Sequence, residues 1–253
     1  MKYLYRIYQL LIALPVLILV TIVTAIEVGV GMTLGNGHFW SYYPGRWWAK
    51  IITRAFLLPV TVEGRENLER NTPYVFVANH QGAFDIFLIY GFLGRNFKWM
   101  MKWQLGKVPF VGYACRKSHQ IFVDKRGPSR VRATYDAARR VLSEGGYSVV
   151  VFPEGARTFT GHMGKFNKGA FALADELQLP VVPLTINGSF DIMPRTRDWH
   201  FANWHPLRLT IHQPIYPVGE GPQNVHATMR QAYDSVMSSL DDKYQGYVEN
   251  PDQ

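Results

Sequence analysis

Two side chains five positions apart could form a proton-handling pair. His80 and Asp85 lie in the segment Asn-His-Gln-Gly-Ala-Phe-Asp. Within one continuous helix, residues five apart point about 140° away from each other. They can meet if His80 lies on a turn and Asp85 begins the next helix, and Asp85 would then accept the Nδ1 proton and make Nε2 more basic. The spacing alone favours the other interpretation, in which the two side chains never touch.

A second candidate group lies in the segment Phe-Pro-Glu-Gly-Ala-Arg-Thr. Arg157 offers a planar guanidinium that suits a phosphate. Glu154 could pair with Arg157 or bind a substrate hydroxyl, and Gly155 allows a close backbone approach. The segment is equally compatible with a surface turn that contains an incidental salt bridge. It does not have the glycine-rich pattern of a P-loop.

Polar residues follow three predicted strands at the points where those strands end. Apolar runs at 74–78, 120–124 and 147–152 are typical of buried strands. Ligands of open α/β sheets bind beyond the carboxyl ends of the strands. Three such ends at one edge predict a site that binds an anion and handles protons. By pattern alone, Lys102 and Arg126 would be ordinary surface residues.

The elements beyond Pro59 alternate between strand and helix. This alternation predicts an α/β fold, with a largely parallel central sheet flanked by helices. Further strands are predicted at 181–186 and 207–212. The predicted helices cover residues 84–92, 130–144 (which Gly145 could end), 168–177 and 224–240.

The N-terminal part has a different composition, because it is mostly apolar. Residues 10–26 carry no charge, and with the following apolar residues they reach the length of about 20 that spans a bilayer. Tryptophans and basic residues follow at 46–54, a mixture typical of a membrane interface. We therefore predict a membrane-anchoring helical segment at residues 1–58 and a catalytic domain at 59–253.

The form of this anchor stays open on sequence alone. It could be one spanning helix, or a helical hairpin in one leaflet with its second helix near residues 40–58. A cleaved signal peptide is disfavoured because no clear cleavage site follows the apolar run. A buried helix of a soluble protein is the remaining alternative. Basic residues lie on both sides, so they do not fix an orientation.

Composition narrows the classes of partner. Of the 253 residues, 27 are Lys or Arg and 19 are Asp or Glu, which gives a net charge of +8 and favours anionic partners. The basic residues are scattered, so a nucleic-acid partner is not expected. The single cysteine, Cys115, excludes an intrachain disulfide. No Cys/His cluster has zinc spacing, so no metal is expected.

Five segments together resemble the glycerolipid acyltransferase family, which contains the 1-acylglycerol-3-phosphate acyltransferases. The family's blocks are matched by NHQGAFD at 79–85, QIFVDKR at 120–126, FPEGARTFTG at 152–161 and LPVVPLTI at 179–186. The stretch KWQLGKVPFVG at 102–112 resembles the segment between the first two blocks. One block would be weak evidence, whereas four in order are a specific pattern.

The resemblance implies a general-base mechanism. His80 would take the proton from an acceptor hydroxyl, and Asp85 would orient the imidazole. A thioester donor is already activated, so a covalent nucleophile is not required. Backbone N–H groups near Gly82 are the candidates for stabilising the oxyanion. Ala156 departs from the family pattern, which puts fine substrate contacts in doubt but not the base.

The resemblance also implies a set of substrate-binding residues. Lys102, Arg126 and Arg157 would hold the phosphate of the acceptor. Glu154 and Gly155 would help to position its glycerol.

The implied reaction moves a fatty acyl group from acyl-CoA or acyl-carrier protein to the sn-2 hydroxyl of 1-acyl-sn-glycerol-3-phosphate. The product would be phosphatidic acid, in phospholipid biosynthesis. No cofactor is expected beyond the donor, and the expected location is the cytoplasmic face of the inner (plasma) membrane. Three alternatives remain: another lysophospholipid or amino-lipid acceptor, a hydrolase, and a membrane lipid-binding protein without turnover.

Overall fold

A seven-stranded mixed sheet forms the centre of the protein, with strand order β1-β7-β6-β2-β5-β3-β4. The computed structural model describes residues 2–143, 146–196, 198 and 200–248. The strands β6, β2, β5, β3 and β4 run parallel, β7 is antiparallel to β6, and β1 is parallel to β7. The strands are β1 (Val60–Glu63), β2 (Val75–Ala78), β3 (Phe97–Lys102), β4 (Ile121–Val123), β5 (Ser148–Val151), β6 (Val181–Asn187) and β7 (Leu207–Ile211). The predicted largely parallel sheet is confirmed.

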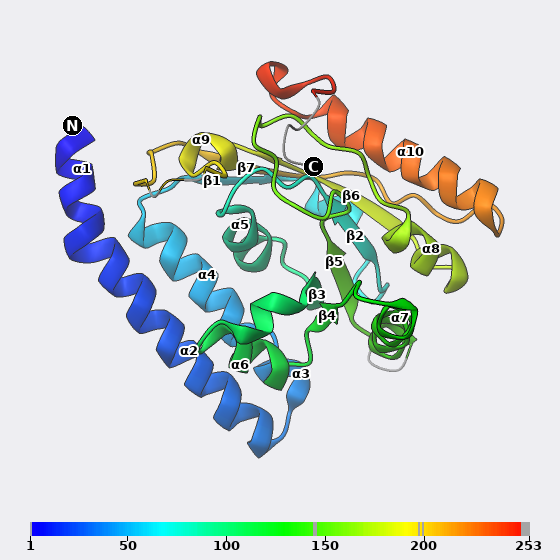
Figure 1. Cartoon of the computed structure of the whole chain (residues 1–253), viewed down its shortest axis with the longest axis horizontal. Helices are drawn as coiled ribbons and strands as arrows, with labels where there is room; N and C mark the ends of the chain where they lie inside the picture. Colours follow the sequence, from blue (N-terminus) through cyan, green and yellow to red (C-terminus); the bar gives the residue numbers. More distant parts are fainter. Residues whose placement is uncertain (1, 144–145, 197, 199, 249–253) are drawn as a thin grey trace.

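Helices cover both faces of this sheet (Figure 1). Phe76 on β2 packs into the core on one face, whereas its neighbours Val75 and Val77 pack into the core on the other, as the period-two geometry of a strand requires. The helices are α4 (Tyr43–Ala55) and α5 (Asp85–Phe92) on the first face, and α7 (Pro128–Ser143), α8 (Gly169–Glu176) and α10 (Pro222–Ser238) on the second. Short helices α3 (Gly37–Trp40), α6 (Val111–Lys117) and α9 (Ser189–Ile192) lie in connections.

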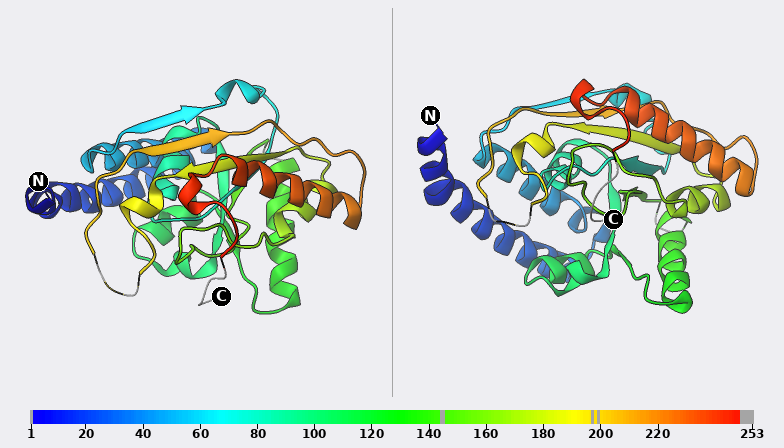
Figure 2. Two further views of the ribbon diagram at one scale, coloured as in Figure 1. Left: turned by 90° about the horizontal axis from the view of Figure 1, so that it is seen from above. Right: turned by 45° about the horizontal axis from the view of Figure 1, so that its top comes forward.

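The apolar N-terminal segment forms one continuous helix along the side of the domain (Figure 2). It consists of α1 (Lys2–Tyr8), a π-helical turn (Gln9–Ala13) and α2 (Leu14–Leu34). This helix is long and apolar enough to cross a membrane, and only 17% of its most apolar 18-residue stretch is buried in the protein.

Contacts with the domain occur along most of that helix. The Gln9 amide exchanges two hydrogen bonds with the backbone of Ala202, at 2.8 and 3.0 Å. The Trp48 indole on α4 donates to the Thr21 hydroxyl at 2.9 Å. Near the helix end, Gly29 leaves the space that the Tyr113 side chain of α6 fills. The helix therefore lies against the domain from its first turns to its last.

Several elements differ from the sequence-based prediction. The strands β1 and β3 and the helix α6 were not predicted, because short charged segments carry little periodicity. The predicted helix at 130–144 is observed as Pro128–Ser143, and Glu144 and Gly145 lie outside the described residues. A helix within the predicted region 40–58 exists as α4. The division at residue 58 stays a prediction, and Ile52 of α4 shares a core cluster with the sheet.

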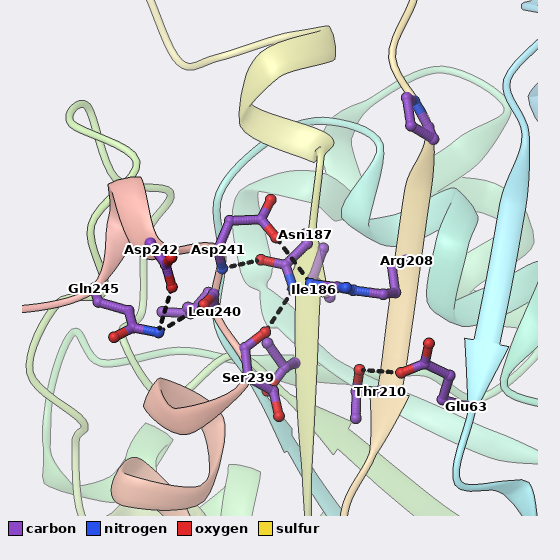
Figure 3. Close-up of polar contacts among 12 residues, drawn as sticks. Glu63, Ile186, Asn187, Arg208, Thr210, Ser239, Leu240, Asp241, Asp242 and Gln245 are labelled. Carbon is purple, nitrogen blue, oxygen red and sulfur yellow. Dashed lines mark hydrogen bonds and ion pairs between the residues drawn. The ribbon is translucent and has the colours of Figure 1, made fainter.

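A polar network fixes the carboxyl end of β6 (Figure 3). The Asn187 amide donates to the Ser239 carbonyl and accepts from the Asp241 N–H, both at 2.8 Å. Arg208 of β7 pairs with Asp241 at 2.8 Å. These bonds join the sheet to the segment after α10, and they hold the chain where it turns toward Ser189.

Candidate active site

His80 and Asp85 are in direct contact. His80 follows β2 on a loop and Asp85 is the first residue of α5, so a turn separates them, as contact requires. The His80 Nδ1 lies 2.7 Å from the Asp85 Oδ2, and the Asp85 side chain is fully buried. The same oxygen accepts the N–H groups of Gln81 and Gly82 at 2.8 and 3.0 Å. The interpretation that the two side chains never touch is wrong.

This contact decides which nitrogen of the imidazole is available. An ionised carboxylate can only accept, so Nδ1 is the donor in this contact, and in the neutral imidazole Nε2 then carries the lone pair. Within the described chain, Nε2 of His80 has no protein hydrogen-bond partner. The His80 ring stacks on Phe152 with centroids 3.8 Å apart and planes at 9°, and its side chain stays 16% exposed. The ring is therefore held rigidly, and its basic nitrogen is accessible.

The loop after β5 is bonded to the loop that carries His80. The His80 N–H donates to the Glu154 Oε1 at 2.7 Å, and the Thr158 N–H donates to the His80 carbonyl at 3.0 Å. The other oxygen of Glu154 accepts the Gly164 N–H at 2.7 Å. Gly155 has φ +80°, a left-handed conformation that suits glycine. Glu154 thus positions the base through its backbone, with both carboxylate oxygens occupied.

Burial dominates the electrostatics of Glu154. Desolvation raises the pKa of this carboxyl to about 8, although its two backbone N–H donors pull the pKa in the opposite direction. Only 6% of the residue is exposed. The predicted contact of Glu154 with a substrate glycerol stays a prediction.

The predicted oxyanion donors near Gly82 are already used. The N–H groups of Gln81 and Gly82 both donate to Asp85, and the Ala83 N–H lies 3.4 Å from the Met193 carbonyl. A Cβ at Gly82 would collide with the backbone of Ser189, so glycine is required there by close packing and not by an open donor. This backbone supports Asp85, and the predicted oxyanion role of N–H groups near Gly82 stays a prediction.

We call Lys102, Arg157 and Arg195 the cation cluster, because their charges act on one another. Arg157 also lies within electrostatic range of Asp85, and it directly precedes Thr158, whose N–H donates to the His80 carbonyl. Burial and the neighbouring Arg195 lower the pKa of Arg157, against the opposing effect of Asp85. Burial also lowers the pKa of Lys102, together with Arg195, Lys125 and Arg157. Mutual repulsion of this kind is relieved when an anion binds.

Arg195 was missed by the sequence analysis. Its Nη1 donates to the Arg157 carbonyl at 3.1 Å, and its guanidinium lies 4.0 Å from the centroid of the Phe159 ring. No motif marks it, because it follows α9 and reaches the site from a distant part of the chain.

Arg126 is engaged differently from the other predicted cations. Its Nε and Nη2 donate to the two carboxylate oxygens of Asp124 at 2.9 and 2.8 Å, and its guanidinium stacks 3.7 Å from the centroid of the Trp103 ring. The paired guanidinium holds the pKa of Asp124 well below its usual range. A phosphate-binding role for Arg126 stays a prediction.

Asn79 is a second residue whose role the sequence did not reveal. It is fully buried, and its amide exchanges two hydrogen bonds with the Ile186 backbone on β6, at 2.9 and 2.8 Å. It thereby fixes the start of the His80 loop on the neighbouring strand. The one feature of the sequence that could have pointed to Asn79 is its position directly before His80.

The fold and the site together define a class of protein: an α/β protein in which an imidazole contacts a buried carboxylate near a cation cluster, at the carboxyl ends of parallel strands. The Acyltransferase family model matches residues 59–187, about half of the chain. The chain belongs to this acyltransferase family.

Several similar proteins are described as 1-acyl-sn-glycerol-3-phosphate acyltransferases. The chain is 34% identical over 178 residues to a chloroplastic 1-acyl-sn-glycerol-3-phosphate acyltransferase of Brassica napus, an alignment that covers 69% of this chain and 50% of the relative. It is 32% identical over 169 residues to the enzyme of that name from Pseudomonas aeruginosa, with 65% and 62% covered. The chain spans about half the length of the first of these relatives and of a similar one from Arabidopsis thaliana.

A solved structure has the same overall arrangement. The 1-acyl-sn-glycerophosphate (LPA) acyltransferase PlsC from Thermotoga maritima superposes with a TM-score of 0.75 at 25% identity. The match covers 92% of this chain and 94% of that one, so it includes at least part of the N-terminal helical segment.

Proposed function

We propose that this chain transfers a fatty acyl group from a thioester donor to the sn-2 hydroxyl of 1-acyl-sn-glycerol-3-phosphate, forming phosphatidic acid. The observation that carries the proposal is the contact between His80 and Asp85, which leaves Nε2 free beside a cation cluster suited to a phosphate monoester. The similar enzymes from Brassica napus and Pseudomonas aeruginosa support the choice of acceptor.

The reaction needs one base and no covalent enzyme intermediate. Nε2 of His80 takes the acceptor hydroxyl proton as that oxygen attacks the thioester carbonyl carbon. The carbon–sulfur bond of the tetrahedral intermediate then breaks, and the imidazolium returns its proton to the departing sulfur. Asp85 stabilises the imidazolium while it exists. The products are the new ester and a free thiol.

The cation cluster would select an acceptor with a phosphate. Lys102, Arg157 and Arg195 come from three separate segments, and their charges act on one another. The carboxylate that acts on Arg157, that of Asp85, is already engaged by His80. A bidentate guanidinium contact suits a phosphate monoester, which carries more charge than a diester. A neutral or zwitterionic head group would leave these charges uncompensated.

The donor is either acyl-CoA or acyl-carrier protein, and both are anionic partners suited to a chain of net charge +8. No further cofactor is required, because the thioester supplies the activation. We place the protein on the cytoplasmic face of the inner membrane, where both donors would be available.

We further propose that the N-terminal helix lies in one leaflet and does not cross the bilayer upright. Its contacts with the domain extend from Gln9 to Gly29. If the helix crossed the bilayer upright, the domain surfaces that contact it would also lie in the hydrocarbon layer. Its apolar side chains on the free side, such as Leu11 and Leu19, are 71% and 62% exposed and would meet lipid.

A panel of acceptors tests this function. Purified protein in detergent micelles would be incubated with labelled acyl-CoA and, separately, acyl-carrier protein, together with lysophosphatidic acid, lysophosphatidylcholine or no acceptor. We expect labelled phosphatidic acid from the first acceptor, and none from His80→Ala. Free fatty acid without an acceptor-dependent product would identify a hydrolase, and binding without turnover would refute acyl transfer.

A further inference from the structure

A basic cavity lies at the amino ends of β3, β4 and β5, opposite the carboxyl ends that carry the candidate active site. Its volume is about 620 Å³, and its wall includes Lys98 at the start of β3, Ile121 at the start of β4, Arg140 on α7 and Met32 near the end of α2. Strand residues rise about 3.3 Å each, so Lys98 lies about 13 Å along β3 from Lys102. The cavity is therefore separate from the cation cluster.

The floor of this cavity contains a buried lysine that acyl transfer does not use. Lys98 is only 2% exposed. Its ammonium donates to the Ser118 carbonyl at 2.9 Å and lies 4.3 Å from the centroid of the Tyr147 ring. An ammonium has three N–H donors, so donors remain for a ligand. Desolvation lowers the pKa of Lys98 to about 7, an unfavourable placement that a bound anion would correct.

Further cations line the walls, and no carboxylate opposes them among the described lining residues. Arg116 on α6 and Arg140 on α7 both line the cavity and are exposed. Arg116 also donates to the Gly106 carbonyl, which orients its guanidinium. Two guanidinium groups and a buried ammonium in the wall of one cavity are the donors that a phosphate group prefers.

The cavity also borders the end of the apolar helix. Met32 of α2 and Gly37 of α3 belong to its lining. The same end of α2 carries exposed apolar side chains on its other side, Val30 and Leu34 at 52% and 77%. A ligand that occupies the cavity therefore meets cations in its wall and lies next to a helix end whose free side is apolar. This arrangement matches a molecule with an anionic head and acyl chains.

We propose that this cavity binds the phosphate head group of an anionic membrane phospholipid, with Lys98, Arg116 and Arg140 around the phosphate. The acyl chains would continue along the exposed apolar side of α2. Such a lipid would hold the protein on an anionic membrane through a site distinct from the one that binds the acceptor. A free phosphate would present the same chemistry to the cations, so the test must separate the two sources.

Native mass spectrometry of the full-length protein provides the test. The protein would be kept in a neutral maltoside detergent and titrated with phosphatidylglycerol, a phosphodiester that is not the proposed acceptor. We expect R116Q/R140Q to bind phosphatidylglycerol at least about tenfold more weakly, because each lost guanidinium removes a charge-assisted hydrogen bond. The matched control is Arg132→Gln, an exposed arginine of α7 outside the cavity lining, which should bind as the wild type does.

The outcomes distinguish a lipid site from a site for free phosphate and from nonspecific attraction by exposed arginines. Retention of phosphatidylglycerol in excess inorganic phosphate, with loss only in R116Q/R140Q, supports the lipid site. Displacement by inorganic phosphate alone, or equal weakening by Arg132→Gln, overturns it. Lys98→Met gives a second, uncharged variant should the double variant fail to fold. Acyl transfer in the same micelles should be unchanged in R116Q/R140Q, so failure of this inference leaves the proposed function intact.

Discussion

The role of Asp85 can be tested by Asp85→Asn, which removes the charge and keeps the shape. The Oδ2 atom accepts the N–H groups of Gln81 and Gly82 as well as the His80 Nδ1 proton. An asparagine would keep its carbonyl oxygen toward these two N–H donors, because the reverse orientation would place N–H against N–H. The tautomer of His80 should therefore survive, and only the charge that stabilises the imidazolium is lost.

The size of the effect follows from that charge. Two charges about 4 Å apart interact by about 4 kcal/mol at an effective dielectric constant of about 20. The imidazolium is only partly formed in the transition state, so we expect kcat to fall by roughly 10²–10³-fold. If the amide instead flipped and imposed the wrong tautomer, the loss would reach about 10⁴-fold, with a lower Tm from two unsatisfied N–H groups.

The assay is continuous detection of the free thiol released from acyl-CoA in the presence of lysophosphatidic acid. Asp136→Asn is the matched control, because Asp136 pairs with Arg139 on the exposed side of α7 and should not change the rate. Combining Asp85→Asn with His80→Ala should cost nothing beyond His80→Ala alone, since the two residues act as a unit. A rate for Asp85→Asn within a few-fold of wild type would refute the assigned role.

Three further perturbations test the surrounding site. Arg195→Gln should raise KM for lysophosphatidic acid about tenfold with less change in kcat, because a charge-assisted hydrogen bond is lost; steady-state kinetics in micelles would show this, and an unchanged KM would exclude Arg195 from the cation cluster's function. Gly82→Ala should lower Tm and activity together, because its methyl group meets the Ser189 backbone, and thermal unfolding with a parallel rate measurement checks both. The raised pKa of Glu154 means that the folded state binds the extra proton between about pH 4.5 and 8, so its contribution to stability is lost as pH rises through this window. Urea unfolding across that range should show a pH-dependent fall in the free energy of unfolding that Glu154→Gln lacks, and equal slopes would contradict the assignment.

The sequence alone determined the local properties of this protein. The order of the blocks around His80 and Glu154 identified the family, and the uncharged run at 10–26 predicted the N-terminal helix. Apolar runs such as 181–186 predicted the central strands to within a residue or two. These properties depend on the neighbours of each residue along the chain, which the sequence displays directly.

Only the tertiary structure decided which of these groups meet. The sheet order places β2 beside β5, which brings the loop of His80 against Glu154, 74 residues later. The tertiary fold also brings Arg195 to the carbonyl of Arg157. Lys98 and Lys102 lie at opposite ends of β3, and only Lys98 lines the cavity. Strand order depends on packing over the whole domain. No single segment of the chain therefore predicts either the cation cluster or the cavity beside Lys98.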